Sequence, residues 1–89
     1  MSSKKTSFRP EAFEHFNFWL RTDRRILIRI MDLLSEILRS PFEGKGKPEP
    51  LKHQLKGLWS RRITDEHRLV YSVSQDEVTV FSCRFHYKR

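Results

Sequence analysis

The hydrophobic pattern of this chain changes its period at one short segment, and this change constrains the fold more than any other feature. The segment is residues 41–50, which read Pro-Phe-Glu-Gly-Lys-Gly-Lys-Pro-Glu-Pro and hold three of the four prolines and two of the three glycines. Such a composition excludes a helix or a central strand, because proline lacks a backbone donor and glycine favours turns. We therefore expect a loop that separates a helical half from a strand-forming half.

Two amphipathic helices are predicted before this loop. Pro10 favours a first helical turn, and Thr22 and Asp23 offer a start for a second helix that ends before Pro41. Apolar residues recur at helical spacing in both segments: Ala12, Phe13, Phe16, Trp19 and Leu20, then Ile26, Leu27, Ile30, Met31, Leu34, Ile37 and Leu38. We therefore expect a helical hairpin whose two apolar stripes face a common core.

Apolar residues alternate after the loop, and this period of two predicts strands at about residues 58–63, 67–74 and 78–85. The connections between these strands are too short for a crossover, so the strands are expected to run antiparallel. Residues 51–55 are expected to form either a short strand or a single helical turn. The predicted fold class is therefore α+β, with an N-terminal helical hairpin packed on one face of an antiparallel β-sheet.

A single domain is expected to account for the whole chain of 89 residues. This length is near the size at which one hydrophobic core becomes adequate without disulfides or metals. We expect the domain to span residues 1–89, with residues 1–7 flexible or forming a weak edge strand at 6–8.

The register of the last two strands decides which side chains face the helices, because a slip of one residue moves every side chain to the other face. A three-residue connection at 75–77 pairs Ser74 with Val78 and places Phe81 on the apolar face with Tyr71. A two-residue turn would instead place Phe81 on the opposite face. We therefore predict the longer connection.

The same logic in the preceding hairpin places Trp59 on the apolar face and Arg62 opposite Arg68 on the exposed face. Arg84 and His86 are expected on this exposed face as well. Clustered arginines repel one another and persist best where an anion binds between them. The exposed face is therefore predicted to bind an anion such as a phosphodiester.

The charge balance also favours a polyanionic partner. Eighteen Lys and Arg residues against eleven Asp and Glu residues give a net charge of +7, and the sequence pI is about 10.1. For so small a domain this excess favours RNA or DNA first, then an acidic protein, then an anionic membrane surface. Charge alone does not choose among them.

The cysteine count and the apolar stretches bound the location of the protein. Cys83 is the single cysteine, so an internal disulfide and a multi-cysteine zinc site are excluded, and no metal or cofactor is implied. Cys83 falls on the apolar face and is expected to be buried and inert. No apolar run follows Lys4 and Lys5, and residues 26–38 are too short to cross a bilayer. A soluble, cytoplasmic protein is expected.

The polar groups predicted near the exposed face match the needs of metal-free RNA cleavage. That reaction needs a base for the 2′-hydroxyl proton, cationic donors for the phosphorane oxygens and an acid for the departing 5′-oxygen. Glu49, the pair of Arg62 and Arg68, and His86 are the candidates for these roles, in that order. Tyr87 is a candidate for orienting the substrate or stacking on a base.

Each of these residues also has a simpler interpretation. Glu49 is consistent with a solvated carboxylate in a linker beside Lys45 and Lys47, and composition alone favours that linker. His86 is consistent with an ordinary residue near the chain end. From the residues alone, a nucleic-acid-binding module without catalysis is favoured over a nuclease.

Four stretches of sequence closely resemble one family of bacterial proteins. They are Pro-Phe-Glu-Gly-Lys-Gly-Lys-Pro-Glu-Pro-Leu-Lys-His at 41–53, Gly-Leu-Trp-Ser-Arg-Arg-Ile at 57–63, Glu-His-Arg-Leu-Val-Tyr at 66–71 and Cys-Arg-Phe-His-Tyr at 83–87. On these residues the chain from about 8 to 87 resembles the Txe/YoeB family of bacterial toxins. That family belongs to the RelE-like superfamily of toxin–antitoxin systems.

The resemblance implies a RelE-like fold and an endoribonuclease (mRNA interferase) that cuts mRNA in the ribosomal A site and leaves a 2′,3′-cyclic phosphate. It implies the role of general base for Glu49, phosphate stabilisation for Arg68 and the role of general acid for His86. It also implies a substrate-orienting role for Tyr87. Two supporting cationic positions complete the implied set, Lys52 and Arg62, beside the cations Lys45, Lys47 and Arg84 already noted.

The resemblance also implies partners. These are a cognate acidic antitoxin, the ribosome with its A-site mRNA, operator DNA reached only through the antitoxin complex, and a second copy of the chain in a homodimer. The implied location is the bacterial cytoplasm, with no membrane partner and no cofactor.

Two segments depart from the family pattern. Residues 4–7, Lys-Lys-Thr-Ser, stand where the family has a more apolar first strand, and Lys88 and Arg89 extend past the usual His-Tyr end. Two alternatives to the interferase function stay open. One is a non-enzymatic basic RNA- or DNA-binding module, and the other is a toxin of the same fold that poisons DNA gyrase.

Overall fold

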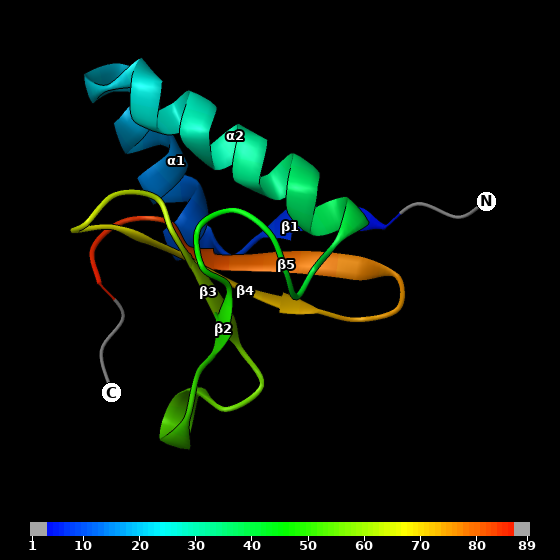
Figure 1. The fold of residues 1–89 in the computed structure, drawn as a ribbon. Helices are drawn as coiled ribbons and strands as arrows, with labels where there is room; N and C mark the ends of the chain where they lie inside the picture. Colours follow the sequence, from blue (N-terminus) through cyan, green and yellow to red (C-terminus); the bar gives the residue numbers. More distant parts are fainter. Residues whose placement is uncertain (1–3, 87–89) are drawn as a thin grey trace.

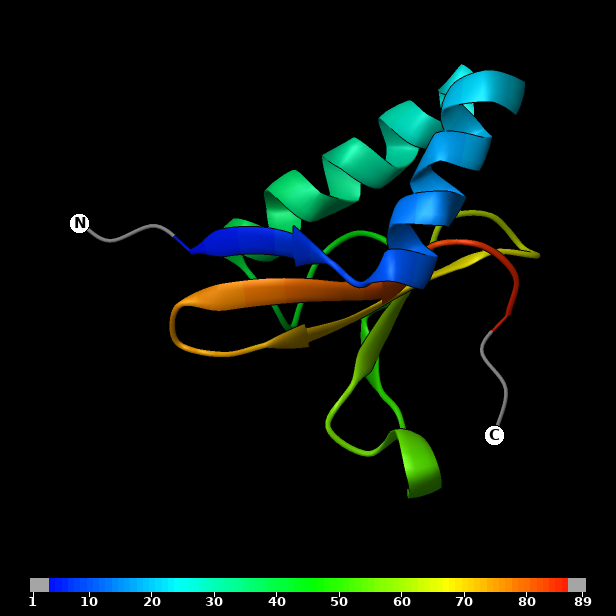
Figure 2. The same cartoon turned by 180° about the vertical axis from the view of Figure 1, so that it is seen from behind.

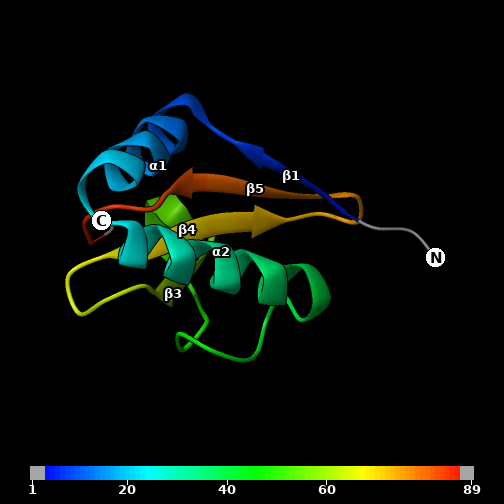
Figure 3. The same ribbon diagram turned by 90° about the horizontal axis from the view of Figure 1, so that it is seen from above.

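The structure is a computed structural model that describes residues 4–86. Two helices, α1 (Pro10–Thr22) and α2 (Arg24–Arg39), lie across one face of a five-stranded sheet (Figure 1). The strands are β1 (Lys5–Phe8), β2 (Glu49–Pro50), β3 (Trp59–Arg62), β4 (Arg68–Val73) and β5 (Glu77–Ser82), and a 3₁₀ turn, η1, spans His53–Leu55. Viewed from above, both helices cover the same face (Figure 3). The predicted α+β class with an N-terminal helical hairpin is confirmed.

The helix boundaries follow the local signals in the sequence. Pro10 occupies the first turn of α1, where its missing N–H breaks no hydrogen bond. The Asp23 carboxylate begins α2 by accepting a hydrogen bond from the Arg25 N–H, with an N···O distance of 3.1 Å. Because a single residue separates the helices, they form a tight hairpin.

The core lies between the helices and the sheet. Its buried members are Ala12, Trp19, Ile30, Leu33, Leu34, Ile37, Ile63, Leu69, Tyr71, Val78, Val80 and Cys83. The predicted stripes were too wide, because Phe13, Leu20, Met31 and Leu38 are exposed. Leu33, which the prediction omitted, is fully buried instead.

The sheet has the strand order β1-β5-β4-β3-β2 and is mixed. Antiparallel pairing is confirmed for the neighbours among β2 to β5. The edge strand β1 pairs with β5 in parallel, so the prediction of a purely antiparallel sheet is wrong at this edge. Short connections force antiparallel pairing only between strands that are adjacent in sequence. Almost the whole chain separates β1 from β5, so the connection between them is long enough to allow parallel pairing.

The predicted register between β4 and β5 is wrong at the turn and right near the chain end. Ser74 N–H donates to the Glu77 carbonyl at 2.8 Å, so the turn has two residues rather than three. Val73 then pairs with Val78, and a β-bulge follows at which Val70 pairs with Ser82. The bulge inserts one extra residue on β5. The two-residue turn places Phe81 on the face away from the helices, and the bulge then returns Cys83 to the core as predicted.

The predicted loop at 41–50 is shorter than expected. Glu49 and Pro50 form strand β2, so the predicted loop ends before them, and the proline-rich composition is tolerated because β2 is an edge strand. From behind, β2 and η1 project below the sheet on the side opposite the helices (Figure 2). Residues 83–85, predicted as strand, lie beyond the end of β5.

Candidate functional site

A row of paired residues crosses the face of the sheet that the helices leave uncovered, here called the open face. Glu49 pairs with Ser60, Ser60 with Val70 and Val70 with Ser82. Directly paired residues project to the same side of a sheet. The sheet pairing therefore places the Glu49 carboxylate on the open face, and Glu49 is itself exposed.

Two arginines lie beside this row. Arg62 and Arg68 are direct partners at the ends of β3 and β4, as predicted. They occupy the open face because each lies two residues along its strand from a member of the row, Ser60 or Val70. The open face thus carries one carboxylate and two guanidinium groups on three neighbouring strands.

Arg68 is held in place by the turn before β4. Its Nη1 donates to the carbonyls of Thr64 at 2.8 Å, Asp65 at 3.1 Å and His67 at 3.2 Å. Its Nε and Nη2 have no hydrogen-bond partner within residues 4–86, and no fully buried side-chain nitrogen or oxygen in this part of the chain lacks one. Arg68 is buried, with 7% of its surface exposed, so these two unpaired nitrogens have limited access to solvent and are the donors that remain free to contact an anion.

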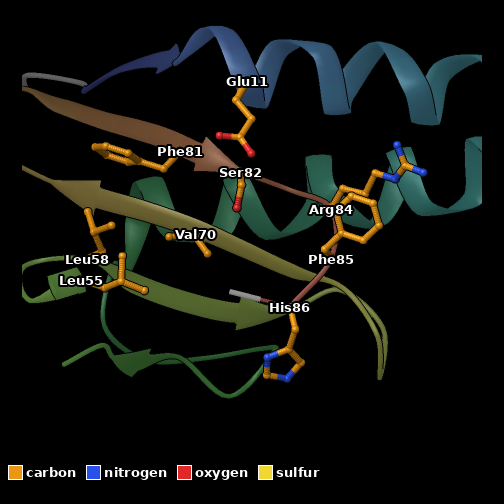
Figure 4. A pocket seen from close by; sticks show the side chains of 9 residues that line it. All are labelled: Glu11, Leu55, Leu58, Val70, Phe81, Ser82, Arg84, Phe85 and His86. Atoms are coloured by element: carbon orange, nitrogen blue, oxygen red, sulfur yellow. The ribbon is translucent and has the colours of Figure 1, made fainter. Parts of the chain in front are cut away.

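A pocket of about 760 Å³ opens on the same face. Leu55, Leu58, Val70 and Phe81 give it an apolar lining, and the polar lining residues include Glu11, Arg84 and His86 (Figure 4). Its volume lies within the range of small-ligand pockets. Phe81 contributes to this lining because the two-residue turn places it on the open face, next to the core residue Val80.

The remaining predicted cations lie apart from the arginine pair. The Arg84 guanidinium lies 3.5 Å from the ring centre of Phe18 and 4.4 Å from that of Phe85. Figure 4 shows Arg84 and His86 pointing in opposite directions. Arg84 therefore stacks toward α1, and its role in substrate binding stays a prediction.

Three lysines surround β2. Lys45 and Lys47 lie in the loop before it, Lys52 follows it, and all three are exposed. Their positions beside Glu49 suit contact with a phosphate backbone, but none makes a hydrogen bond through its ammonium group within residues 4–86. Tyr87 lies outside the described residues.

The loop that leads to Glu49 is fixed by a buried arginine, Arg61, to which the sequence analysis gave no role. Its side chain is 0% exposed. All five guanidinium hydrogens have an acceptor: the Tyr71 hydroxyl, the Glu36 carboxylate and the carbonyls of Ser40, Glu43 and Lys45. Strand alternation was the available signal, since it places Arg61 on the helix-facing side with Trp59 and Ile63.

Glu36 completes this anchor from helix α2. Its Oε1 accepts from the Lys45 backbone N–H at 2.6 Å and from Arg61. The Lys45 N–H first, and then the Arg61 guanidinium, lower the pKa of the Glu36 carboxyl below its usual 4.5. Gly44 allows the close approach, because a Cβ at its position would lie 2.3 Å from Glu36 Oε1. The loop is therefore a structured element rather than a solvated linker.

Two negative findings bound the chemistry of the described part. Residues 4–86 contain no group of three or more His, Cys, Asp or Glu side chains arranged to hold a metal ion. Within the same residues, neither helix has the length and apolar character needed to cross a membrane.

Comparison with known proteins identifies the class of protein to which this fold belongs. A structure described as the YoeB/ParE toxin from Agrobacterium tumefaciens superposes with a TM-score of 0.91 at 48% identity, covering 93% of this chain and 99% of that one. Toxin YoeB of Escherichia coli strain K12 is 52% identical over 83 residues, which are 93% of this chain and 99% of the relative. The fold is thus that of a small α+β bacterial toxin.

The family follows from the same comparisons. Residues 8–87 match the family described as the YoeB-like toxin of bacterial type II toxin-antitoxin system. The chain belongs to this family and is a toxin of a type II toxin–antitoxin system, which confirms the resemblance seen in the sequence. Staphylococcus aureus YoeB, 42% identical to this chain, has been solved as a dimer and as a heterotetrameric complex with the antitoxin YefM, with TM-scores of 0.89 and 0.88. Both comparisons cover 94% of this chain and 98% of that one.

Replacing the buried guanidinium with an apolar side chain tests the anchor. We expect Arg61→Met to lower the free energy of unfolding by about 3 kcal/mol, because several buried carbonyls and the Tyr71 hydroxyl lose their donor. Urea denaturation measures this change, and Arg62→Met is the matched control on the exposed side of the same strand. An equal loss in both variants, or none in either, would contradict the anchor.

The lowered pKa of Glu36 predicts an acid dependence of stability. A carboxyl whose pKa is lower in the folded than in the unfolded protein stabilises the fold above pH 4.5, and this contribution disappears as the pH falls through the folded value. We expect the difference in unfolding free energy between wild type and Glu36→Gln to be largest at neutral pH and to shrink below pH 4.5. A difference independent of pH would show that the charge of Glu36 is unimportant.

Proposed function

We propose that this toxin is a ribosome-dependent endoribonuclease that cleaves mRNA in the A site without a metal ion and so inhibits translation. The observation that carries the proposal is the sharing of one sheet face by Glu49, Arg62 and Arg68, with His86 lining the adjoining pocket. Family membership and the net charge of +7 support the same conclusion.

The proposed reaction is an internal phosphoryl transfer. Glu49 takes the proton from a ribose 2′-hydroxyl, and the 2′-oxygen forms a bond to the adjacent phosphorus. The bond from phosphorus to the 5′-oxygen breaks, and His86 gives that oxygen a proton. The products are a 2′,3′-cyclic phosphate on the upstream fragment and a 5′-hydroxyl on the downstream fragment.

Charge stabilisation falls to the arginine pair in this mechanism. The unpaired nitrogens of Arg68 are directed to the phosphorane oxygens, and Arg62 supports them from the neighbouring strand. Lys45, Lys47 and Lys52 contribute contacts to the RNA backbone. Tyr87 orients the substrate, and Arg84 is assigned to RNA binding rather than to the chemical step.

The proposal extends to partners and location. The open face is cationic, so it suits an acidic antitoxin that covers the same groups, as well as the ribosome and its mRNA. We assign operator DNA to the antitoxin complex rather than to the toxin alone. A homodimer is proposed for the free toxin, by analogy with the solved Staphylococcus aureus dimer. The proposed location is the bacterial cytoplasm.

Ribosome dependence is tested by adding the purified protein, in chelator, to programmed ribosomes and to the same mRNA free in solution. We expect new ends in the A-site codon with a cyclic phosphate, and only when ribosomes are present. Tight ribosome binding without new ends would favour a binding module. Signs of DNA damage in cells without mRNA cleavage would favour a gyrase poison.

The acid and base roles are tested by isosteric variants. We expect Glu49→Gln and His86→Gln each to reduce the single-turnover cleavage rate by about 10²- to 10⁴-fold, the usual contribution of one acid or base group, while ribosome binding persists. Glu43→Gln is the control, because Glu43 is an exposed carboxylate of the preceding loop. Full cleavage by the first two variants would remove both assignments.

A further inference from the structure

The residues that follow strand β5, 83–86, are here called the terminal segment, and two histidine side chains hold its backbone. Cys83 N–H donates to His15 Nδ1 at 3.2 Å, and Phe85 N–H donates to His67 Nδ1 at 2.7 Å. The indole Nε1–H of Trp19 donates to the Cys83 carbonyl at 2.8 Å. Side chains from α1 and from the β3–β4 turn thus hold three backbone groups of this segment.

The backbone at Phe85 is in the left-handed region, with φ of 66°. A non-glycine residue in this region is less stable by about 1 kcal/mol or more and persists only where its surroundings fix it. Two hydrogen bonds do so here, because Phe85 N–H donates to His67 and the Phe85 carbonyl accepts from Arg68 N–H at 3.0 Å. His86 follows directly, so its position depends on this strained residue.

Both histidines lie in surroundings that support this role. His15 is 9% exposed on the buried side of α1 between Ala12 and Trp19. The rings of His15 and His67 lie 6.2 Å and 6.1 Å from that of Phe85. The sequence analysis gave neither histidine a principal role.

A histidine nitrogen accepts a hydrogen bond only when it carries no proton. Both imidazoles must therefore be neutral, with the proton on Nε2, for the two bonds to the terminal segment to exist. Once either ring is doubly protonated, its Nδ1–H faces a backbone N–H, and the bond becomes a repulsive contact.

We propose that His15 and His67 are positioning residues that hold His86 in its active position, and that they do so only as neutral imidazoles. They act through the backbone amides of Cys83 and Phe85 and do not contact the reacting atoms. The consequence for cleavage rests on the proposed function, whereas the hold on the terminal segment does not.

The charges around the two rings favour the neutral forms. Burial is the main cause that lowers the pKa of both His15 and His67 below 6.5, and the Arg84 guanidinium acts in the same direction on both. Arg68 lowers the pKa of His67 further, and the neighbouring His67 lowers the pKa of His15. The opposing groups are Glu11 and Glu14 near His15 and Glu66 near His67.

The sign of the pH effect follows from these shifts. Each Nδ1 bond to the terminal segment exists only while its imidazole is neutral, so proton binding disfavours the held state. Because the pKa of each ring lies below 6.5, the held state is fully favoured above pH 6.5 and loses free energy as the pH falls through the lowered values. The terminal segment is therefore released on the acid side of neutrality.

Replacing histidine by asparagine keeps a hydrogen-bond acceptor but removes the titratable group, because Oδ1 takes the place of Nδ1 and does not bind a proton between pH 7.5 and 5.5. The experiment uses the full chain as wild type, the double variant His15→Asn with His67→Asn, and the single variants His15→Leu and His67→Leu. Amide hydrogen exchange of Cys83 and Phe85, normalised to that of strand β5, is followed from pH 7.5 to 5.5. The exposed His53 supplies the control His53→Asn.

We expect wild type and His53→Asn to lose protection at Cys83 and Phe85 below pH 6.5, and the double Asn variant to keep it. Each Leu variant is expected to lack protection at its partner amide at every pH. Protection in wild type that does not change with pH, or protection that survives in both Leu variants, would overturn the proposal. If a Leu variant does not fold, the comparison of wild type with the double Asn variant still tests whether protonation of the two histidines releases the segment.

Cleavage in the programmed-ribosome assay tests the consequence for His86. At pH 7.5 we expect His67→Leu to cleave about 10²-fold more slowly, the usual effect of a small misplacement of a reacting group, and the double Asn variant to stay close to wild type. Full activity of His67→Leu with lost amide protection would overturn the positioning role. Absence of cleavage in wild type would reject the proposed function alone, because hydrogen exchange reports the hold on the segment independently.

Discussion

The buried guanidinium of Arg61 is the constraint on which the second half of the structure depends. One side chain joins helix α2 through Glu36, the following loop through three carbonyls and strand β4 through the Tyr71 hydroxyl. Tyr71 in turn donates to the Pro41 carbonyl at 2.8 Å. A loop rich in proline and glycine has few backbone partners of its own. Arg61 satisfies its carbonyls, and the loop therefore delivers Glu49 to the sheet in a fixed register.

The proposed site consequently has two independently supported ends. Glu49, on the edge strand β2, depends on the Arg61 anchor. His86, which follows the end of β5, depends on the two histidine acceptors. Between them, Arg62 and Arg68 are fixed by the pairing of β3 with β4. Damage to one support is expected to displace one of these groups and leave the others in place, so the proposed acid and the proposed base can be disturbed separately.

Local signals in the sequence predicted the elements well, and contacts between distant residues limited the rest. The Pro10 start, the Asp23 cap and the pairing of Arg62 with Arg68 each depend on a few neighbouring residues. The turn after Ser74 is one residue shorter than predicted, and the bulge near Phe81 adds one residue to β5. The two changes cancel beyond the bulge. Alternation alone therefore predicted the wrong turn but the right face for Cys83. The parallel pairing of β1 could not be predicted from local sequence either, because its partner β5 lies near the other end of the chain.

The same limit applies to charge. Arg61 and Arg62 are neighbouring arginines, yet strand alternation buries the first side chain and exposes the second. Arg61 uses its donors within the fold, and Arg84 stacks between two aromatic rings. Arg61 therefore adds no charge to the open face, although it counts toward the net charge of +7, and Arg84 lines the pocket on that face with its guanidinium stacked on aromatic rings. The charge available to a polyanion is set by which cations keep donors that the fold leaves unpaired, as Arg68 does within residues 4–86, and this depends on tertiary contacts rather than on composition.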